Sequence, residues 1–322
     1  MALRIRDVWL DYGTAASDRK LLENVSGICW DDPFLWTVSD EGRTLECLEP
    51  HGNGFRLHRQ IALDALFEGP PGQRKEDEAD IESIDVASGR IWLCGSHCIV
   101  RRQINKTKSD IVDPQFRVRK SRRLLGSVTI AYALSETDDG KETGIALPFS
   151  GKGSLRRRLS TNRYLRPFID LPSKENGLDI EGLAVVGRKV LLGLRGPTVD
   201  SIAIVVELSL GAEGSIKSSS PRLNFLNLDG LGVRDLARSD DGLFVLAGPV
   251  TGSRRPFRLY QWRRRATDRI QTPELRYEWP ADGDAPEGIC QKDQGLLIGY
   301  DLKPNSRRIK GGRVRADWLT GM

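Results

Sequence analysis

A short motif recurs five times along this chain of 322 residues. Each copy begins with an acidic or small polar residue followed by a hydrophobic step, and an apolar strand ends 14 residues after its first residue. Internal repeats with periods of roughly 20–50 residues are typical of solenoids, propellers and related arrays, so they restrict the fold strongly. The five copies are Ser26-Gly27-Ile28, Glu82-Ser83-Ile84, Glu181-Gly182-Leu183, Asp235-Leu236-Ala237 and Glu287-Gly288-Ile289.

Each motif opens a short apolar strand, which is followed by a turn and by a second apolar segment too short for a helix. Four antiparallel strands at a fixed period are typical of propeller blades. The sequence therefore predicts an all-β fold, a β-propeller of five four-stranded blades, with six blades as the alternative. Third and fourth strands are expected at 44–48, 55–61, 124–132, 201–207, 223–226, 257–262 and 275–279.

The spacing of the motifs defines the domain organisation. The second and third copies are 99 residues apart, whereas the others are 52 to 56 apart. A degenerate blade or an insertion could fill this gap, and we favour an insertion at 135–175 with a helix at 155–166. The last copy lacks a fourth strand, so we expect residues 4–10 to close the last blade and protect its edge. The whole chain, 1–322, is then a single domain.

Composition narrows the cellular context. No apolar run approaches the ~18 residues of a membrane-spanning helix, and the start has no hydrophobic signal segment. Five cysteines, an odd number, are typical of reduced thiols in a cytoplasmic protein. We therefore expect a cytoplasmic protein without a membrane partner.

The net charge of +5 is unevenly distributed. Residues 101–123 carry nine basic and two acidic residues, and residues 303–315 carry six basic residues and no acidic ones. Such runs are commonly solvated faces or guarded edge strands. The alternative is that they bind a nucleic acid or an acidic protein partner.

The repeats also predict a site. In a propeller blade the start of the first strand and the end of the second meet at one mouth of the central channel. Carboxylates crowded there repel one another and need a cation, protons or basic partners. Oxygen ligands from separate blades suit calcium or another divalent cation, although each acid could instead accept backbone hydrogen bonds. The expected metal ligands are Glu82, Glu181, Asp235 and Glu287.

Basic residues near the same mouth favour a small anionic ligand. A metal beside basic residues is a common arrangement for phosphate esters. Arg195 and Arg234 could clamp the anion, while His97 or Glu181 could act as the base. The candidate catalytic residues are thus His97, Glu181, Arg195 and Arg234. Candidate substrate-binding residues are Asp40, Lys174, Asn176, Asp179 and Asp301.

Longer segments of the chain resemble a known family, the domain of unknown function 3616. The match covers most of the chain, but it implies no particular activity. The Asp-x-Glu-Gly-Leu pattern is also similar to that of esterase-like phytase propellers, which implies phosphoester chemistry or calcium binding. Two residues depart from this pattern: Ser26 stands where other copies have an acid, and Ser83 stands in place of the glycine that follows the acid. The segments that carry the resemblance are 92–97, 174–184, 193–197, 231–237, 247–249 and 286–289.

These observations favour a propeller with a polar, metal-binding channel mouth that hydrolyses a phosphate ester or a similar anion. The alternative is a non-catalytic scaffold that binds a protein or nucleic acid, because propellers often serve as interaction platforms.

Overall fold

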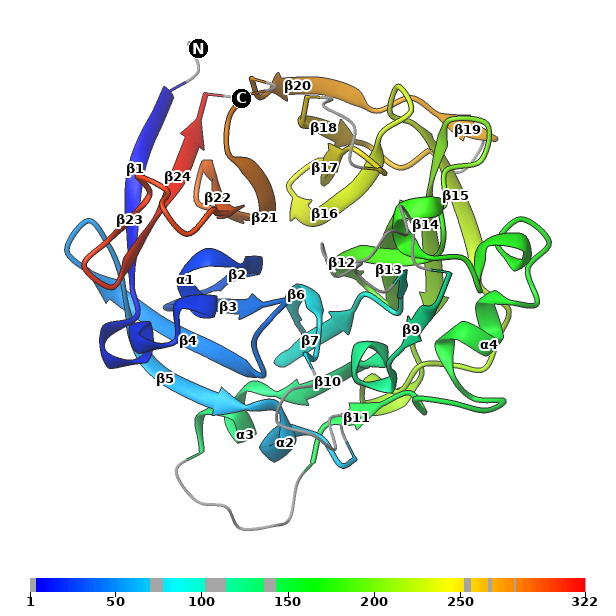
Figure 1. Ribbon diagram of the computed structural model, residues 1–322, viewed down its shortest axis with the longest axis horizontal. Helices are drawn as coiled ribbons and strands as arrows, with labels where there is room; N and C mark the ends of the chain where they lie inside the picture. Colours follow the sequence, from blue (N-terminus) through cyan, green and yellow to red (C-terminus); the bar gives the residue numbers. More distant parts are fainter. Residues whose placement is uncertain are drawn as a thin grey trace.

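The computed structural model describes residues 4–69, 78–101, 114–135, 143–251, 256–265, 268–280 and 282–321. These residues form an all-β propeller, in which four-stranded antiparallel units surround a common centre (Figure 1). The predicted fold class is therefore confirmed. We call the units blades and describe each from the centre to the rim.

The first blade contains β2 (Val25–Asp31), β3 (Phe34–Ser39), β4 (Thr44–His51) and β5 (Gly54–Ala62). The second contains β6 (Ile81–Ala87), β7 (Arg90–Gly95), β10 (Leu125–Thr129) and β11 (Ile145–Ala146). The third contains β12 (Asp179–Val186), β13 (Lys189–Gly196), β14 (Ile202–Ser209) and β15 (Arg222–Asn227). The fourth contains β16 (Gly232–Ser239), β17 (Gly242–Gly248), β18 (Arg258–Trp262) and β20 (Glu274–Glu278). The last contains β21 (Ala285–Lys292), β22 (Gly295–Asp301), β24 (Arg313–Thr320) and β1 (Arg4–Asp11).

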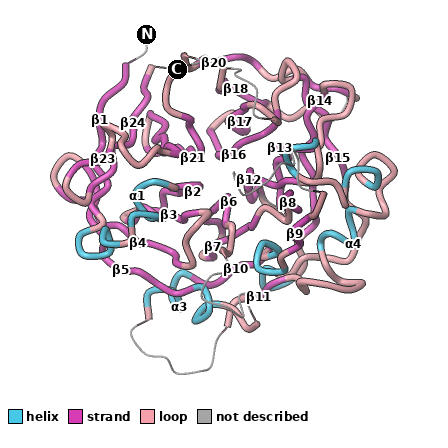
Figure 2. The backbone as a smooth tube through the Cα atoms, viewed as in Figure 1, coloured by secondary structure: helices cyan, strands magenta, loops and turns pink. Residues whose placement is uncertain are grey.

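Shorter elements decorate the blades. Among the strands, β8 pairs with β9, β19 adds to β15, and β23 pairs with β24. Helices α3 and α4 lie at the periphery (Figure 2). No helix among the described residues is long and apolar enough to cross a membrane. The bounds are β8 (Ile99–Arg101), β9 (Phe116–Val118), β19 (Ile270–Gln271), β23 (Ile309–Lys310), α1 (Arg19–Glu23), α2 (Leu63–Leu66), α3 (Ile130–Leu134) and α4 (Leu155–Leu159).

The core lies between the faces of neighbouring blades. Middle strands are buried on both faces and therefore read as continuous apolar runs, as in Val190–Leu194 of β13. One apolar cluster joins the first, fourth and last blades through residues such as Leu35, Leu246 and Leu297. A second cluster packs α4 against the second and third blades. This packing fixes the innermost strands β2, β6, β12, β16 and β21 around the centre (Figure 1).

The strand expected at residues 4–10 is β1, and it lies at the outer edge of the last blade. It pairs antiparallel with β24 along its whole length, from Arg4 opposite Thr320 to Asp11 opposite Arg313. It also pairs in parallel with β5 of the first blade. The first and last segments of the described chain are thus hydrogen-bonded in one sheet.

Two local expectations differ from the structure. The helix expected at 155–166 ends at Leu159, where the Ser160 and Thr161 hydroxyls donate to the carbonyl oxygens of Arg157 at 2.8 Å and Arg158 at 2.7 Å. The strand expected at 124–132 ends at Thr129, whose side chain caps α3. This strand is also the third of its blade rather than the fourth, since it pairs directly with β7. Parts of the predicted insertion (136–142) and of the first basic run (102–113) lie outside the described residues.

Candidate functional site

The inner strand of each blade carries a break in register at its start. At these breaks one strand has an extra residue that faces no partner, which is a β-bulge. Bulges bend a strand and re-aim the side chain of the extra residue. Here they bring one residue from each blade to the channel mouth. The bulged positions are Ser26, Glu82, Glu181, Arg234 and Glu287, the last together with Gly288.

The fourth motif is therefore shifted by one residue from the position read in the sequence. Arg234 occupies the bulge, and Asp235 lies one residue beyond it. The buried Asp235 carboxylate accepts hydrogen bonds at 2.8 Å from the Ser83 hydroxyl and from the Leu236 and Ile289 amides. These contacts join the second, fourth and last blades. Asp235, expected to bind a metal, is occupied instead by protein donors.

An alternating chain of acids and arginines crosses the mouth. Arg195 pairs with Asp179 and, through Nη1, with Glu181 Oε1 at 2.6 Å. Arg234 Nη1 lies 2.8 Å from Glu181 Oε2, and Arg234 also forms a two-pronged contact with Glu287. The sequence Asp179, Arg195, Glu181, Arg234, Glu287 thus links the third, fourth and last blades. Both predicted clamp arginines are already engaged by carboxylates.

A glycine makes this proximity possible. A Cβ atom on Gly232, at the start of β16, would lie 2.1 Å from the carbonyl oxygen of Arg195. Such a contact is impossible, so only glycine lets β16 approach the end of β13 so closely. Arg234 and Arg195 consequently meet on the same Glu181 side chain.

A second polar group lies on the second blade and was not predicted. Asp80 is buried, accepts a hydrogen bond from the Ser96 hydroxyl and lies 3.1 Å from Arg122 Nη1. Arg122 Nη2 also contacts Glu78 at 3.0 Å. Asp80 precedes Glu82 by two residues, as Asp179 precedes Glu181. This shared Asp-Ile-Glu pattern was the available signal for Asp80 in the sequence.

Glu82 and Asp40 are acids that form no ion pair with a described residue. Glu82 has no hydrogen bond or ion pair with any described residue, and it faces Asp80, Glu181, Asp40 and Asp179. Burial and these neighbours hold the pKa of Glu82 well above its ordinary value. Burial, together with Asp80, raises the pKa of Asp40 to about 8.

The mouth as a whole is acidic. Burial and the adjacent Glu287 raise the pKa of Asp301 to about 6. Burial also raises the pKa of Glu181, although Arg195 and Arg234 oppose this effect. Without a further cation, part of this set must bind protons at neutral pH. Seven carboxyl groups face three guanidinium groups: Asp40, Asp80, Glu82, Asp179, Glu181, Glu287 and Asp301 against Arg122, Arg195 and Arg234.

The donor set suits a hard cation, because it consists of carboxylate oxygens. In their present positions, no three described His, Cys, Asp or Glu side chains are already arranged around a metal ion. Binding would therefore require side-chain movement, for which the unpaired Glu82 is the best placed. The orphaned carboxylate and the excess of acids fit a cation, and the metal remains a prediction.

A basic pocket lies beside the acidic mouth. It has a volume of about 320 Å³ and is lined by residues of β8, β9 and the segment before β12. Arg122 lines it and also contacts Asp80, so this side chain connects the pocket with the mouth. Arg101 is held by Glu175 at 2.6 Å. Lys174, a predicted substrate-binding residue, is exposed at the same pocket.

Two other predicted residues have structural contacts. His97 is buried, its Nε2 lies 3.2 Å from the Leu124 carbonyl oxygen, and burial lowers its pKa to about 3. It is thus a neutral, enclosed side chain, although it was expected to act as a base. The Asn176 side chain accepts from the Thr198 amide at 2.9 Å and donates to its carbonyl at 3.0 Å, which fixes a loop.

The second basic run, 303–315, is partly neutralised within the protein. Arg308 contacts Asp284 at 2.6 Å and Asp317 at 2.8 Å, and Arg315 lies 3.4 Å from Asp7. A protein or nucleic-acid partner at either basic run remains a prediction.

Comparison with known proteins identifies a family. The family model described as "Protein of unknown function (DUF3616)" matches residues 24–317. No curated protein matches the chain. Similar solved structures include YCF48 bound to D1 peptide (10% identity, TM-score 0.34). That alignment covers 92% of this chain and 63% of the YCF48 chain. Others are Myxococcus xanthus glutaminyl cyclase (8%, TM-score 0.47, 98% of this chain and 95% of that one) and streptogramin B lyase (10%, 0.40, 99% and 97%).

Proposed function

We propose that this chain, which belongs to the DUF3616 family, binds a divalent cation at its channel mouth and hydrolyses a phosphate ester there. The observation that carries the proposal is the Glu82 carboxylate, which faces four other carboxyl groups and forms no hydrogen bond or ion pair with a described residue. The neighbouring Arg195 is in contact with Asp179 and Glu181 instead. Perturbed carboxyls gathered in a channel are typical of functional sites. A purely structural cluster would pair each acid, as the protein does for Asp235.

The cation would be held by Glu82 and Asp40. Both have raised pKa values, with burial as the largest cause, so a bound cation would replace protons. The carboxylates of Glu181 and Glu287 are engaged by arginines and would shape the site rather than coordinate. When bound, a divalent cation supplies Lewis-acid polarisation of a phosphoryl oxygen.

The anionic end of the substrate would enter the adjacent basic pocket. Arg195 and Arg234, expected to clamp the anion, are already neutralised by three carboxylates. The exposed Lys174 and Arg117 line a pocket of about 320 Å³, which Arg122 connects with Asp80. A phosphate group suits them, because charge-assisted contacts to phosphate are strong.

The chain also offers a group for proton transfer. In hydrolysis, the oxygen of water bonds to phosphorus and the bond between phosphorus and the leaving oxygen breaks. One proton leaves the water and one reaches the leaving alcohol. Asp301, which is not assigned to the cation and has a pKa of about 6, is suited to accept the first and donate the second near neutral pH. It replaces His97, which is enclosed.

The first experiment measures cation binding. Calcium, magnesium and manganese are titrated separately into wild type, Glu82→Gln and Glu49→Gln, with calorimetry and thermal melting as readouts. Glu49 is a matched control, because it lies on β4 and pairs with Arg56 away from the mouth. We expect one cation to raise the melting temperature of wild type and the control, while Glu82→Gln loses about tenfold or more in affinity. Equal binding by all three proteins would refute the site.

The second experiment measures hydrolysis. Para-nitrophenyl phosphate and a set of sugar phosphates are assayed with the cation present, using wild type, Lys174→Ala and Lys152→Ala. Lys152 is an exposed lysine outside the pocket. We expect Lys174→Ala to raise KM more than it lowers kcat, because the lysine binds the anion without reacting. Cation binding without hydrolysis of any ester would leave a binding protein and reject the hydrolase.

A further inference from the structure

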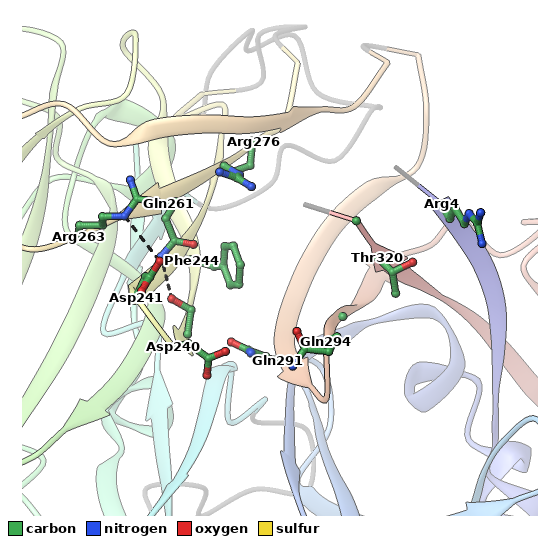
Figure 3. A pocket seen from close by; sticks show the side chains of 13 residues that line it. Arg4, Asp240, Asp241, Phe244, Gln261, Arg263, Arg276, Gln291, Gln294 and Thr320 are labelled. Atoms are coloured by element: carbon green, nitrogen blue, oxygen red, sulfur yellow. Dashed lines mark hydrogen bonds and ion pairs between the residues drawn. The ribbon is translucent and has the colours of Figure 1, made fainter. Parts of the chain in front are cut away.

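The rims of neighbouring blades are joined unequally. β1 pairs in parallel with β5, and β15 pairs in parallel with β19, so two seams are bridged by backbone hydrogen bonds. Among the described strands, no pairing joins β20 to β1 or to β24. A cleft of about 740 Å³ opens at this seam between the fourth and last blades (Figure 3). We call it the seam cleft, and its volume lies within the roughly 300–1,000 Å³ of small-molecule sites.

The floor of the seam cleft consists of two amide side chains and one aromatic ring. Gln291 Oε1 is buried without a hydrogen-bond partner among the described residues. Gln261 is 7% exposed, and its Nε2 donates to Ser239 Oγ at 2.7 Å, while its Oε1 accepts from no described residue. The Phe244 ring lies between the two walls (Figure 3). A buried amide oxygen without a donor is unfavourable, so a ligand hydroxyl there would restore a lost hydrogen bond.

The charged residues of the cleft are largely balanced against one another. Arg263 Nη1 and Arg276 Nη1 both contact Glu274, at 2.8 Å and 2.9 Å, and Arg263 also lies 3.9 Å from Asp241. The turns at Asp240 and Gln294 form the rim on either side (Figure 3). The cleft therefore offers paired donors and acceptors with little net charge, which disfavours a phosphate or another strongly charged ligand.

We propose that the seam cleft is a saccharide-binding site. Sugar hydroxyls both donate and accept hydrogen bonds, which matches amide side chains. The exposed part of the Phe244 side chain, which is 9% accessible, can contact an apolar edge of a sugar ring. Ser239, Asp240 and Gln291 also line the neighbouring end of the central channel, so the cleft continues inward. The inference is independent of the cation and phosphate ester at the opposite mouth.

Saturation-transfer NMR followed by calorimetry tests this site. Glucose, maltose, cellobiose, lactose and diacetylchitobiose are each offered to wild type, Gln291→Leu, Gln261→Leu and Gln60→Leu. Gln60 is an exposed glutamine on β5 and provides a matched control. Circular dichroism melts establish that each variant is folded before binding is measured.

We expect at least one saccharide to bind wild type and Gln60→Leu saturably. Gln291→Leu should weaken that binding about tenfold or more, because the ligand loses its most buried acceptor. Glu82→Gln should bind the saccharide as wild type does, since Glu82 belongs to the channel mouth. Absence of binding by all five sugars, or equal binding by both cleft variants and wild type, would overturn the proposal.

Discussion

Replacing Asp40 by asparagine should stabilise the protein at neutral pH. The pKa of Asp40 is raised to about 8 in the folded protein, mainly by burial and then by Asp80, and is about 3.9 when unfolded. Between these values the folded state holds a proton that the unfolded state has released. Stability therefore falls as pH rises through this window. Asparagine removes the titration and keeps an acceptor for the Glu41 amide, which Asp40 Oδ1 binds at 2.7 Å.

The size of the effect follows from the shift. Each pH unit contributes up to about 1.4 kcal/mol, so about three units up to pH 7 give at most about 4 kcal/mol. Asp40 is only partly buried, and screening by water reduces the electrostatic contribution. We therefore expect Asp40→Asn to raise the free energy of unfolding by about 2 kcal/mol at pH 7.

Urea denaturation of wild type and Asp40→Asn at pH 4.5, 6, 7 and 8.5, without divalent cations, measures this difference in the free energy of unfolding. The gain should grow with pH and level off above about 8. A variant that is no more stable than wild type at any of these pH values would show that Asp40 is ionised in the folded protein.

Three further results are expected. Asp235→Ala should lower the free energy of unfolding, measured by urea denaturation, by about 3–5 kcal/mol, because the Ser83 hydroxyl and the Ile289 amide lose a buried acceptor. A loss of less than about 1 kcal/mol would contradict this role of Asp235. Cation affinity should rise from pH 6 to pH 8, because protons on Glu82 and Asp40 compete with the metal. Calorimetry in buffers of different ionisation enthalpy should detect the protons that are released on binding. An affinity that does not change with pH would contradict binding of the cation by these two acids. Leu10→Ala in β1 should cost about 2–5 kcal/mol, since Leu10 is fully buried, and an unchanged denaturation midpoint would contradict the closure of the last blade by this strand.

The strands were predictable because each one is indicated by the hydrophobic pattern of its own consecutive residues. Val190–Leu194 reads as a buried strand without knowledge of its neighbours. The ends of elements were harder to predict, because at Thr129, Ser160 and Thr161 a polar side chain binds the backbone where a strand or a helix ends.

The gathering of acids at one channel mouth was predictable from the repeat, but the pairing of those acids was not. Glu82, Glu181 and Glu287 were found from the repeat, because bulges recur at the same point of each inner strand. The fourth copy was misread by one residue, since an acid followed by leucine matched the motif while Arg234 filled the bulge. Which acid meets which arginine depends on the distances between blades, and those are not encoded in any one segment.

The pairing of β1 with β24 has a consequence for the order of events during synthesis. β1 precedes its antiparallel partner β24 by most of the propeller, so it is synthesised long before that partner. Until β24 has been synthesised, the short parallel pairing with β5 is the strand pairing available to β1. An unpaired strand is a site for wrong associations, and domains under synthesis can be exposed in this way. The outer edge of β1 thus stays unpaired on the β24 side while the intervening blades are made, and the ring can close only after β24 has been synthesised.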